Sequence, residues 1–405
     1  MNTIAESYVK LVLKTGLFNP NYVDAYYGPD EYKPKGLVAD SSLLNDISIE
    51  ADSLLNELER LASFKATNLE KLRYRFLYKQ ALAVRSEIYL LQGGQFTFEE
   101  EAKNLYDVTL EESSYKQMDS TLNALDKLVP GNGSLQKRLD EFRNQFIVPQ
   151  DKLDKVFQTA IQECRKRTLE HIKLPENEKF TVEYVQDKPW AAYNWYKGNN
   201  YSVIQVNNTL PILIDRIIDL AAHEGYPGHH VYNSLLETNM VDKNKWKEFS
   251  VYPLFSPQSF IAEGSANYGI DMIFPEVERV KYEKSILFPL AGLDSSKADL
   301  YYRIFNIVEE LSFASNKISA DYLDGKINKD KAIELLMKYI LMKKEKAEQR
   351  IRFLETYRSY VINYNVGKKV IKDYIEGHSR NDDERWKLFE EILSTPQTPS
   401  GLMEK

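Results

Sequence analysis

Several residue types and patterns are scarce in this chain of 405 residues, and each scarcity excludes a class of protein. The single cysteine, Cys164, rules out an internal disulfide and argues against a thiolate metal site. No run of residues approaches the roughly 18 apolar positions that span a membrane. The N-terminus also lacks the basic and apolar regions of a signal peptide. We therefore expect a cytoplasmic protein with no membrane partner.

Positive charge is scarce as well. Lys and Arg together number 53 against 60 Asp and Glu, which gives a formal net charge of −7 at pH 7. This balance argues against nucleic acid as the main partner. The chain is 43% hydrophobic and 28% charged, which is typical of a soluble globular protein. It contains no internal repeat, phosphate-binding loop, dinucleotide fingerprint or serine nucleophile elbow.

Histidine is scarce but concentrated in one place. Three of the five histidines (His223, His229 and His230) fall within the segment 220–230, and Glu224 lies beside the first of them. Histidine is the commonest metal ligand, and a glutamate next to the first ligand is the arrangement of zinc hydrolases. The segment therefore predicts a metal site that activates water. The alternative is a break between two helices at which the histidines are merely polar.

The spacing differs from the familiar H-E-x-x-H pattern, because the fourth residue after His223 is Pro227. On a regular helix neither His229 nor His230 would reach a metal bound by His223. Pro227 and Gly228 permit an irregular backbone that can restore the convergence. A bulge of two residues makes His229 the second ligand, and a bulge of three makes it His230. The smaller distortion favours His229, which leaves His230 behind the ligands or facing the substrate.

A third ligand is expected, because catalytic zinc usually has three protein ligands and an open position for water. Glu263 is the best candidate, since it lies in the apolar helical stretch 259–268, where a carboxylate is costly to bury without a partner. Otherwise it is an ordinary glutamate that faces solvent. We predict one zinc ion per chain held by His223, His229 and Glu263, with Glu224 as the general base of hydrolysis.

These motifs resemble the bacterial family catalogued as domain of unknown function 885, which looks like a relative of the gluzincin metallopeptidases. The family often carries a histidine in the helix that corresponds to Tyr302–Ser315, and this chain has none there. The resemblance covers most of the chain, loosely between about residues 40 and 180. It rests on four segments: His223-Glu-Gly-Tyr-Pro-Gly-His229, Ala262-Glu-Gly264, Tyr22-Val-Asp-Ala-Tyr-Tyr-Gly-Pro29 and Asn363-Tyr-Asn-Val-Gly367.

The resemblance implies a mainly α, zincin-like (gluzincin) metallopeptidase fold with a small β-sheet next to the metal-binding helix. It is expected to form one domain over residues 1–405, with a helical scaffold half (1–175) and a metal-site half (176–405). It implies short peptides as substrates, in the manner of a carboxypeptidase or dipeptidase. It also makes Tyr364 a candidate donor to the oxyanion, with His230 as the alternative.

The pattern of apolar residues agrees with this picture. Between about residues 41 and 173, apolar residues recur at steps of three and four, which predicts antiparallel helices. Phe180–Val185 and Tyr201–Asn207 alternate and predict strands, either a substrate-holding sheet or a hairpin packed on the helices. Asn208 or Thr209 is expected to cap the metal helix.

Two segments near the C-terminus have simpler interpretations. The charged run Lys343–Arg350 predicts a solvated helix face, and Thr395–Gly401 predicts a loose tail. Two other functions stay open from the sequence. One is hydrolysis of a non-peptide amide or ester, and the other is peptide binding by a non-catalytic protein that carries a metal.

Overall fold

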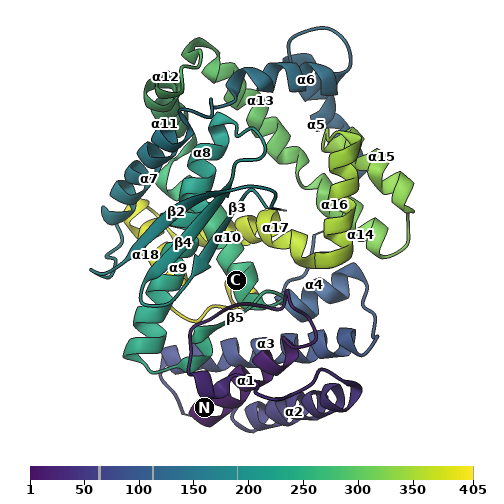
Figure 1. Ribbon diagram of the computed structural model, residues 1–405, viewed down its shortest axis with the longest axis vertical. Helices are drawn as coiled ribbons and strands as arrows, with labels where there is room; N and C mark the ends of the chain where they lie inside the picture. The colour runs from purple at the N-terminus through teal and green to yellow at the C-terminus, as the bar shows by residue number, and fades with distance from the viewer. Residues whose placement is uncertain (63–64, 112–113, 189, 405) are drawn as a thin grey trace.

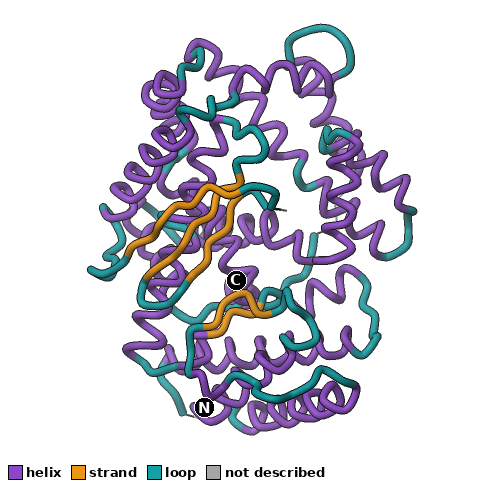
Figure 2. The backbone as a smooth tube through the Cα atoms, viewed as in Figure 1, coloured by secondary structure: helices purple, strands orange, loops and turns teal. Residues whose placement is uncertain are grey.

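The computed structural model describes residues 1–62, 65–111, 114–188 and 190–404, and helices dominate it (Figure 1). Two small sheets lie among these helices (Figure 2). This is the mainly helical architecture with a small sheet that the sequence predicts. The helices before residue 175 are α1 (Asn2–Thr15), α2 (Ser41–Arg60), α3 (Asn68–Leu91), α4 (Phe98–Tyr106), α5 (Tyr115–Leu128), α6 (Leu135–Arg143) and α7 (Leu153–Leu169).

Local sequence signals explain where several of these helices begin. The Thr97 hydroxyl accepts a hydrogen bond from the Glu100 backbone N–H at 3.3 Å, and the Glu100 carboxylate accepts one from the Thr97 N–H at 2.9 Å. This reciprocal capping box satisfies two backbone donors at the start of α4. Thr67 and Glu70 form the same box at the start of α3.

The larger sheet has the strand order β2 (Lys179–Val185), β4 (Tyr201–Asn207) and β3 (Ala192–Tyr196). Both predicted strands are confirmed, but they pair in parallel rather than as a hairpin. The segment between them is itself a strand, β3, which pairs antiparallel with the other side of β4. The sheet packs against α9 (His229–Leu236), so it lies beside the histidine-rich segment.

The metal helix is shorter than the sequence suggests. α8 (Ile214–Leu220) continues into one π-helical turn, Ala221–Gly225, before the chain turns into α9. Leu213 occupies the N-cap position, so the prediction of a cap at Asn208 or Thr209 is wrong. The Thr209 hydroxyl instead accepts a hydrogen bond from the Asp187 backbone N–H at 2.7 Å, which ties the end of β4 to the end of β2.

The C-terminal half contains α10 (Pro257–Ile273), α11 (Glu276–Tyr282), α12 (Phe288–Ala291), α13 (Ala298–Leu311), α14 (Ala314–Leu323), α15 (Lys329–Tyr339), α16 (Lys344–Tyr357), α17 (Ile362–His378), α18 (Asp382–Ser394) and α19 (Pro399–Met403). The prediction of a loose tail is wrong, because its last residues form α19. Thr398 caps this helix and Leu402 is buried. The tail is ordered because its apolar side chains pack against residues that are distant in sequence and come together only when the chain folds.

Two glycines bring α10 and α17 into close contact. A Cβ atom added to Gly264 would lie 2.6 Å from the backbone carbon of Gly367, and one added to Gly367 would lie 3.0 Å from the Gly264 Cα. No larger residue fits at either position without separating the helices. The crossing holds Glu263 of α10 close to the first turn of α17, which carries Tyr364.

The N-terminal region also reaches this crossing. β1 (Val23–Tyr26) pairs antiparallel with β5 (Val251–Pro253), which lies just before α10. The register shifts between Val23 and Ala25, so Asp24 occupies a β-bulge. Bulges commonly redirect a side chain next to a functional site.

None of the helices within the described residues is long and apolar enough to cross a membrane.

Candidate metal centre

The backbone at the histidine segment folds back on itself. The Tyr226 N–H donates to the Ala221 carbonyl at 3.2 Å, and the Gly228 N–H donates to the Ala222 carbonyl at 2.9 Å. The Tyr226–Pro227 peptide bond is cis. A Cβ at Gly228 would lie 1.9 Å from the His223 carbonyl oxygen, so only glycine fits there.

This tight turn replaces the bulge that the spacing suggests, and a new helix begins at His229. The rings of His223 and His229 meet edge to face, with centroids 4.7 Å apart and planes at 89°. The irregular backbone therefore brings the two imidazoles together across six residues.

Glu263 lies between these two imidazoles. Its Oε2 is 3.3 Å from His223 Nε2, and its Oε1 is 3.6 Å from His229 Nε2. The Tyr360 hydroxyl donates a hydrogen bond of 2.8 Å to Oε1. Oε2 is buried and has no hydrogen-bond partner among the described residues. A buried carboxylate oxygen without a partner is costly, so its position indicates a ligand.

The donor set fits a zinc ion. Possible ligand atoms of His223, Glu224 and His229 all lie within 4.8 Å of one another, so this group could hold a metal ion. Glu263 adds a carboxylate that approaches both imidazoles. Two imidazoles and a carboxylate are a common ligand set of catalytic zinc. Either glutamate could supply the third ligand by distance alone.

The two glutamates differ in their electrostatic surroundings. Burial alone would raise the pKa of Glu263, but the positive charge shared by His229 and His223 outweighs it and holds this pKa well below its usual range. Burial raises the pKa of Glu224, despite the opposing effect of the same histidines. Burial lowers the pKa of His229, but Glu263 overcomes this and raises it to about 9. Glu263 is thus the stronger ion-pairing partner, and Glu224 the more basic carboxylate.

His230 lies apart from this group although it is the next residue. It is completely buried, with Nδ1 2.8 Å from the Ser202 hydroxyl and Nε2 3.0 Å from Glu178 Oε2. Glu178 also accepts hydrogen bonds from Tyr226 at 2.6 Å and Arg165 at 2.7 Å. Both ring nitrogens of His230 are therefore engaged with the sheet side of the molecule, away from Glu263.

Tyr364 lies next to Tyr360, which holds Glu263. Its ring meets Tyr360 edge to face at 5.7 Å between centroids, and its carbonyl accepts a hydrogen bond from the Asn267 amide at 3.3 Å. The side chain is 37% exposed, yet burial of its hydroxyl raises the pKa of the phenol well above its usual range. It is thus reachable from solvent and remains protonated.

Two residues near the group escaped the sequence reasoning. Asp24 lies within electrostatic range of His229, Glu263 and Glu224, and its pKa is raised to about 7, chiefly by burial. Tyr360 holds one oxygen of Glu263. Asp24 stands inside one of the motifs that carry the resemblance, which is the signal that could have identified it.

The edge strand β3 adjoins the histidine-rich segment. The Asn194 side-chain amide donates a hydrogen bond of 2.7 Å to the Glu224 carbonyl. The sheet is thereby fixed to the π-helical turn. Within the part of the chain that the structure describes, β3 has only β4 as a partner strand in the larger sheet.

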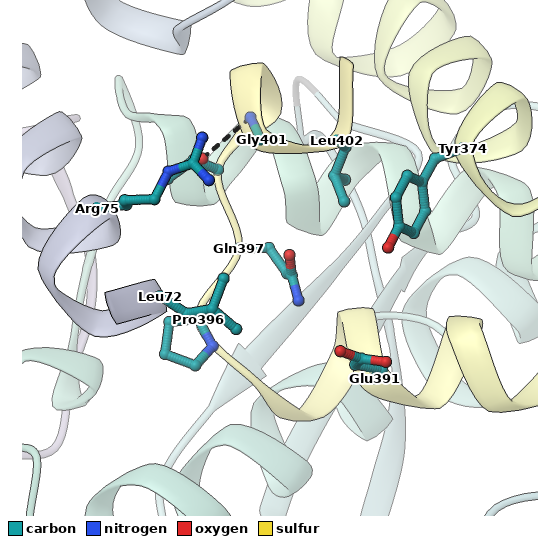
Figure 3. Close-up of a pocket in the computed structure, with 9 residues that line it drawn as sticks. Leu72, Arg75, Tyr374, Glu391, Pro396, Gln397, Gly401 and Leu402 are labelled. Atoms are coloured by element: carbon teal, nitrogen blue, oxygen red, sulfur yellow. Dashed lines mark hydrogen bonds between the residues drawn. The ribbon is translucent and has the colours of Figure 1, made fainter. Parts of the chain in front are cut away.

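A small cavity lies elsewhere in the molecule (Figure 3). Its volume is about 110 Å³, and its walls come from α3, α17, α18 and the C-terminal segment. Its lining includes Arg75, Tyr374, Glu391 and Gln397, and it shares no residue with the metal group. It therefore belongs to the packing of the C-terminal segment.

No protein-family model matches the chain, and no curated protein matches its sequence. Among solved structures, a predicted lipoprotein from Colwellia psychrerythraea is 14% identical with a TM-score of 0.55, over 90% of this chain and 69% of that one. A predicted lipoprotein of unknown function from Shewanella oneidensis is 14% identical with a TM-score of 0.51, over 89% and 72%. These two similarities show a shared fold. An M32 carboxypeptidase from Deinococcus radiodurans R1 is 11% identical with a TM-score of 0.45, over 100% and 94%.

Proposed function

We propose that the protein is a zinc-dependent hydrolase, and specifically a metallopeptidase that cleaves short peptides. The observation that carries this proposal is the convergence of His223, His229 and Glu263 around an unpartnered, buried carboxylate oxygen. We assign Glu263 as the third ligand because Tyr360 fixes it in place and its pKa is held low. Glu224 is left as the catalytic base. The motif resemblance to domain of unknown function 885 and the gluzincins supports the same assignment.

The chain supplies most of the chemistry around the ion. Zinc, when bound, acts as a Lewis acid and lowers the pKa of a water molecule towards 7. Glu224 accepts a proton from the attacking water and passes it to the departing amine. Tyr364 donates a hydrogen bond to the oxyanion that forms at the peptide carbonyl, which typically contributes about 3 kcal/mol.

The edge strand β3 is suited to hold the peptide main chain. An extended peptide can add to an open strand edge through backbone hydrogen bonds. The bond from Asn194 to the Glu224 carbonyl keeps this edge in register with the catalytic segment. Short peptides are the substrate class that the motif resemblance supports.

The proposal is tested by metal content and by hydrolysis together. Protein purified without chelator is analysed by mass spectrometry, and zinc-loaded protein is incubated with a broad peptide library. We expect about one zinc per chain, with hydrolysis that stops on chelation and returns with zinc. If the protein binds zinc and hydrolyses small amides or esters but no peptides, its substrates are non-peptide amides or esters. Zinc without any hydrolysis would leave a metal-bearing binding protein.

A further inference from the structure

The charged segment Lys343–Arg350, predicted to be a solvated helix face, is not exposed along its whole length. Lys343, Lys344, Glu345 and Lys346 are exposed, as expected, but Arg350 turns inward. Its Nε is buried and has no hydrogen-bond partner among the described residues. Its one hydrogen bond is from Nη2 to the Ser315 hydroxyl at 3.3 Å, and its guanidinium carbon lies 5.0 Å from the centre of the Phe353 ring. All of its protein partners are uncharged.

Other buried arginines of the described chain are paired with carboxylates. Arg73 binds Glu248 through two nitrogens, at 2.5 Å and 3.1 Å, with both side chains almost fully buried. Arg279 binds Asp219 and Glu283, each at 2.8 Å. A buried charge without a counter-ion is strongly unfavourable. Burial lowers the pKa of Arg350, and no carboxylate among the described residues offsets this effect.

Contacts between helices link Arg350 to the segment that carries Tyr364. Arg350 bonds to Ser315 of α14, and the next residue, Asn316, donates a hydrogen bond of 2.7 Å to the side chain of Asn365. The Tyr364 phenol is within electrostatic range of Arg350, Glu263 and Glu224. Arg350 and the metal group thus share Tyr364 as a common neighbour. Arg350 as a whole residue is half-buried, so its side chain is not completely enclosed by the protein.

We propose that Arg350 binds the C-terminal carboxylate of the peptide, and that the substrates are therefore peptides cleaved near a free C-terminus. A guanidinium presents parallel N–H donors that match a carboxylate, and Arg350 makes only one hydrogen bond within the described residues, so its other donors are vacant. Tyr364 is next to Arg350 and donates to the scissile carbonyl. A peptide carboxylate bound by Arg350 would therefore be the C-terminal carboxylate of the residue that hydrolysis releases. This inference deepens the proposed function and rests on it for the catalytic step.

Binding is measured separately from catalysis, so that failure of one proposal is distinguishable from failure of the other. The probes are N-acetyl dipeptides ending in alanine, phenylalanine or lysine, each as a free acid and as a C-terminal amide. Titration calorimetry uses zinc-loaded protein in which Glu224→Gln prevents turnover. On this background, the otherwise wild-type protein is compared with Arg350→Met, Arg350→Lys and Arg352→Met. Arg352 is an exposed arginine on the same helix and is the matched control.

We expect the wild type and Arg352→Met to prefer the acid over the amide by at least about 30-fold in Kd. Arg350→Met should bind both forms alike, and Arg350→Lys should keep a reduced preference. Thermal unfolding shows whether each variant is folded; if Arg350→Met is not, Arg350→Lys decides. The proposal is overturned if the wild type shows no preference, binds neither form, or keeps its preference when Arg350 is replaced.

One further probe identifies the source of the carboxylate. An amide peptide with a glutamate side chain at its last residue should bind as weakly as the other amides. If it binds as tightly as the acids, and does so through Arg350, the site recognises an acidic side chain rather than a C-terminus. That outcome would also overturn the inference.

Discussion

Two clusters of histidine and glutamate lie back to back in this protein, and the adjacent residues His229 and His230 belong to different ones. In the first, His223 and His229 approach Glu263, one of whose oxygens has no hydrogen-bond partner among the residues that the structure describes. In the second, His230 and Glu178 are enclosed, and both nitrogens of the imidazole have partners. The residue types are the same. The difference lies in whether the protein itself satisfies their polar atoms.

This difference distinguishes a cluster that can bind a ligand from one that only supports the fold. Buried polar atoms in folded proteins are nearly always hydrogen-bonded, so a closed network is complete without a ligand. A network that leaves a carboxylate oxygen unpaired is complete only when something else binds. The same argument applies to Arg350, which is a cation rather than a carboxylate. Its partners among the described residues, Ser315 and Phe353, are neutral, so its charge is not balanced by the protein.

The largest expected effect follows from removing a ligand of the first cluster. His229→Ala should lower zinc affinity by more than about 100-fold, because replacing even a residue that supports a ligand costs 10–100-fold. Zinc content by mass spectrometry is the measurement. His378→Ala, at an exposed histidine on α17, is the control and should keep its zinc. Full zinc in His229→Ala would show that a different residue is the second ligand.

Replacing the proposed base should separate binding from chemistry. Glu224→Gln should retain zinc and lose about 10³–10⁴-fold in kcat, because the amide cannot accept the proton from water. Steady-state hydrolysis and zinc content are measured on the same preparation. Glu310→Gln, at an exposed glutamate, serves as the matched control. A Glu224→Gln enzyme with near-normal kcat contradicts the assignment, and one without zinc makes Glu224 a ligand.

The second cluster should respond in stability rather than in metal content. His230→Ala leaves the Glu178 carboxylate buried with one partner fewer, so we expect a loss of about 3 kcal/mol in the free energy of unfolding. Urea denaturation measures this loss, and zinc content should stay near that of the wild type. If His230→Ala is stable but loses zinc, the two clusters are not separate.

A smaller effect is expected from the hydrogen bond that holds Glu263. Tyr360→Phe removes the donor 2.8 Å from Oε1 and should weaken zinc binding by about 10-fold or more. Competition with a fluorescent zinc chelator gives the affinity. Tyr357→Phe, one turn away, controls for loss of a tyrosine hydroxyl and should bind as the wild type does. Equal affinities in the two variants would show that Tyr360 does not position the ligand.

The smallest expected effect is on the loss of folding stability at low pH. Burial alone would raise the pKa of Glu178, but hydrogen bonds with His230, Tyr226 and Arg165 outweigh it and hold this pKa below its ordinary value of 4.5. The resulting stabilisation is present above that value and is lost as the pH falls through the lower folded-state pKa. Glu178→Gln should therefore lose less stability on acidification, by on the order of 1 kcal/mol. Denaturation at falling pH measures it, and parallel curves for the two proteins would contradict it.

Much of the fold follows from local patterns in the sequence. The helices between residues 41 and 173 and the strands β2 and β4 are confirmed, because their apolar periodicity and capping residues act over a few positions. The pairing of β2 with β4 was not foreseen, since parallel pairing depends on where β3 returns the chain. α19 and the inward turn of Arg350 were missed for a similar reason. Their partners are distant in sequence.

The candidate site divides in the same way. The sequence by itself determined that residue types able to bind a metal are concentrated at residues 223–230, because they are close neighbours along the chain. Only the tertiary structure decided that His229 faces Glu263 and His230 faces Glu178, because a backbone turn of unpredictable shape separates two neighbouring side chains. It also decided that Asp24 and Tyr360 lie near the group. Strand pairing across more than 200 residues and the Gly264–Gly367 helix crossing bring them there, and neither leaves a local trace in the sequence.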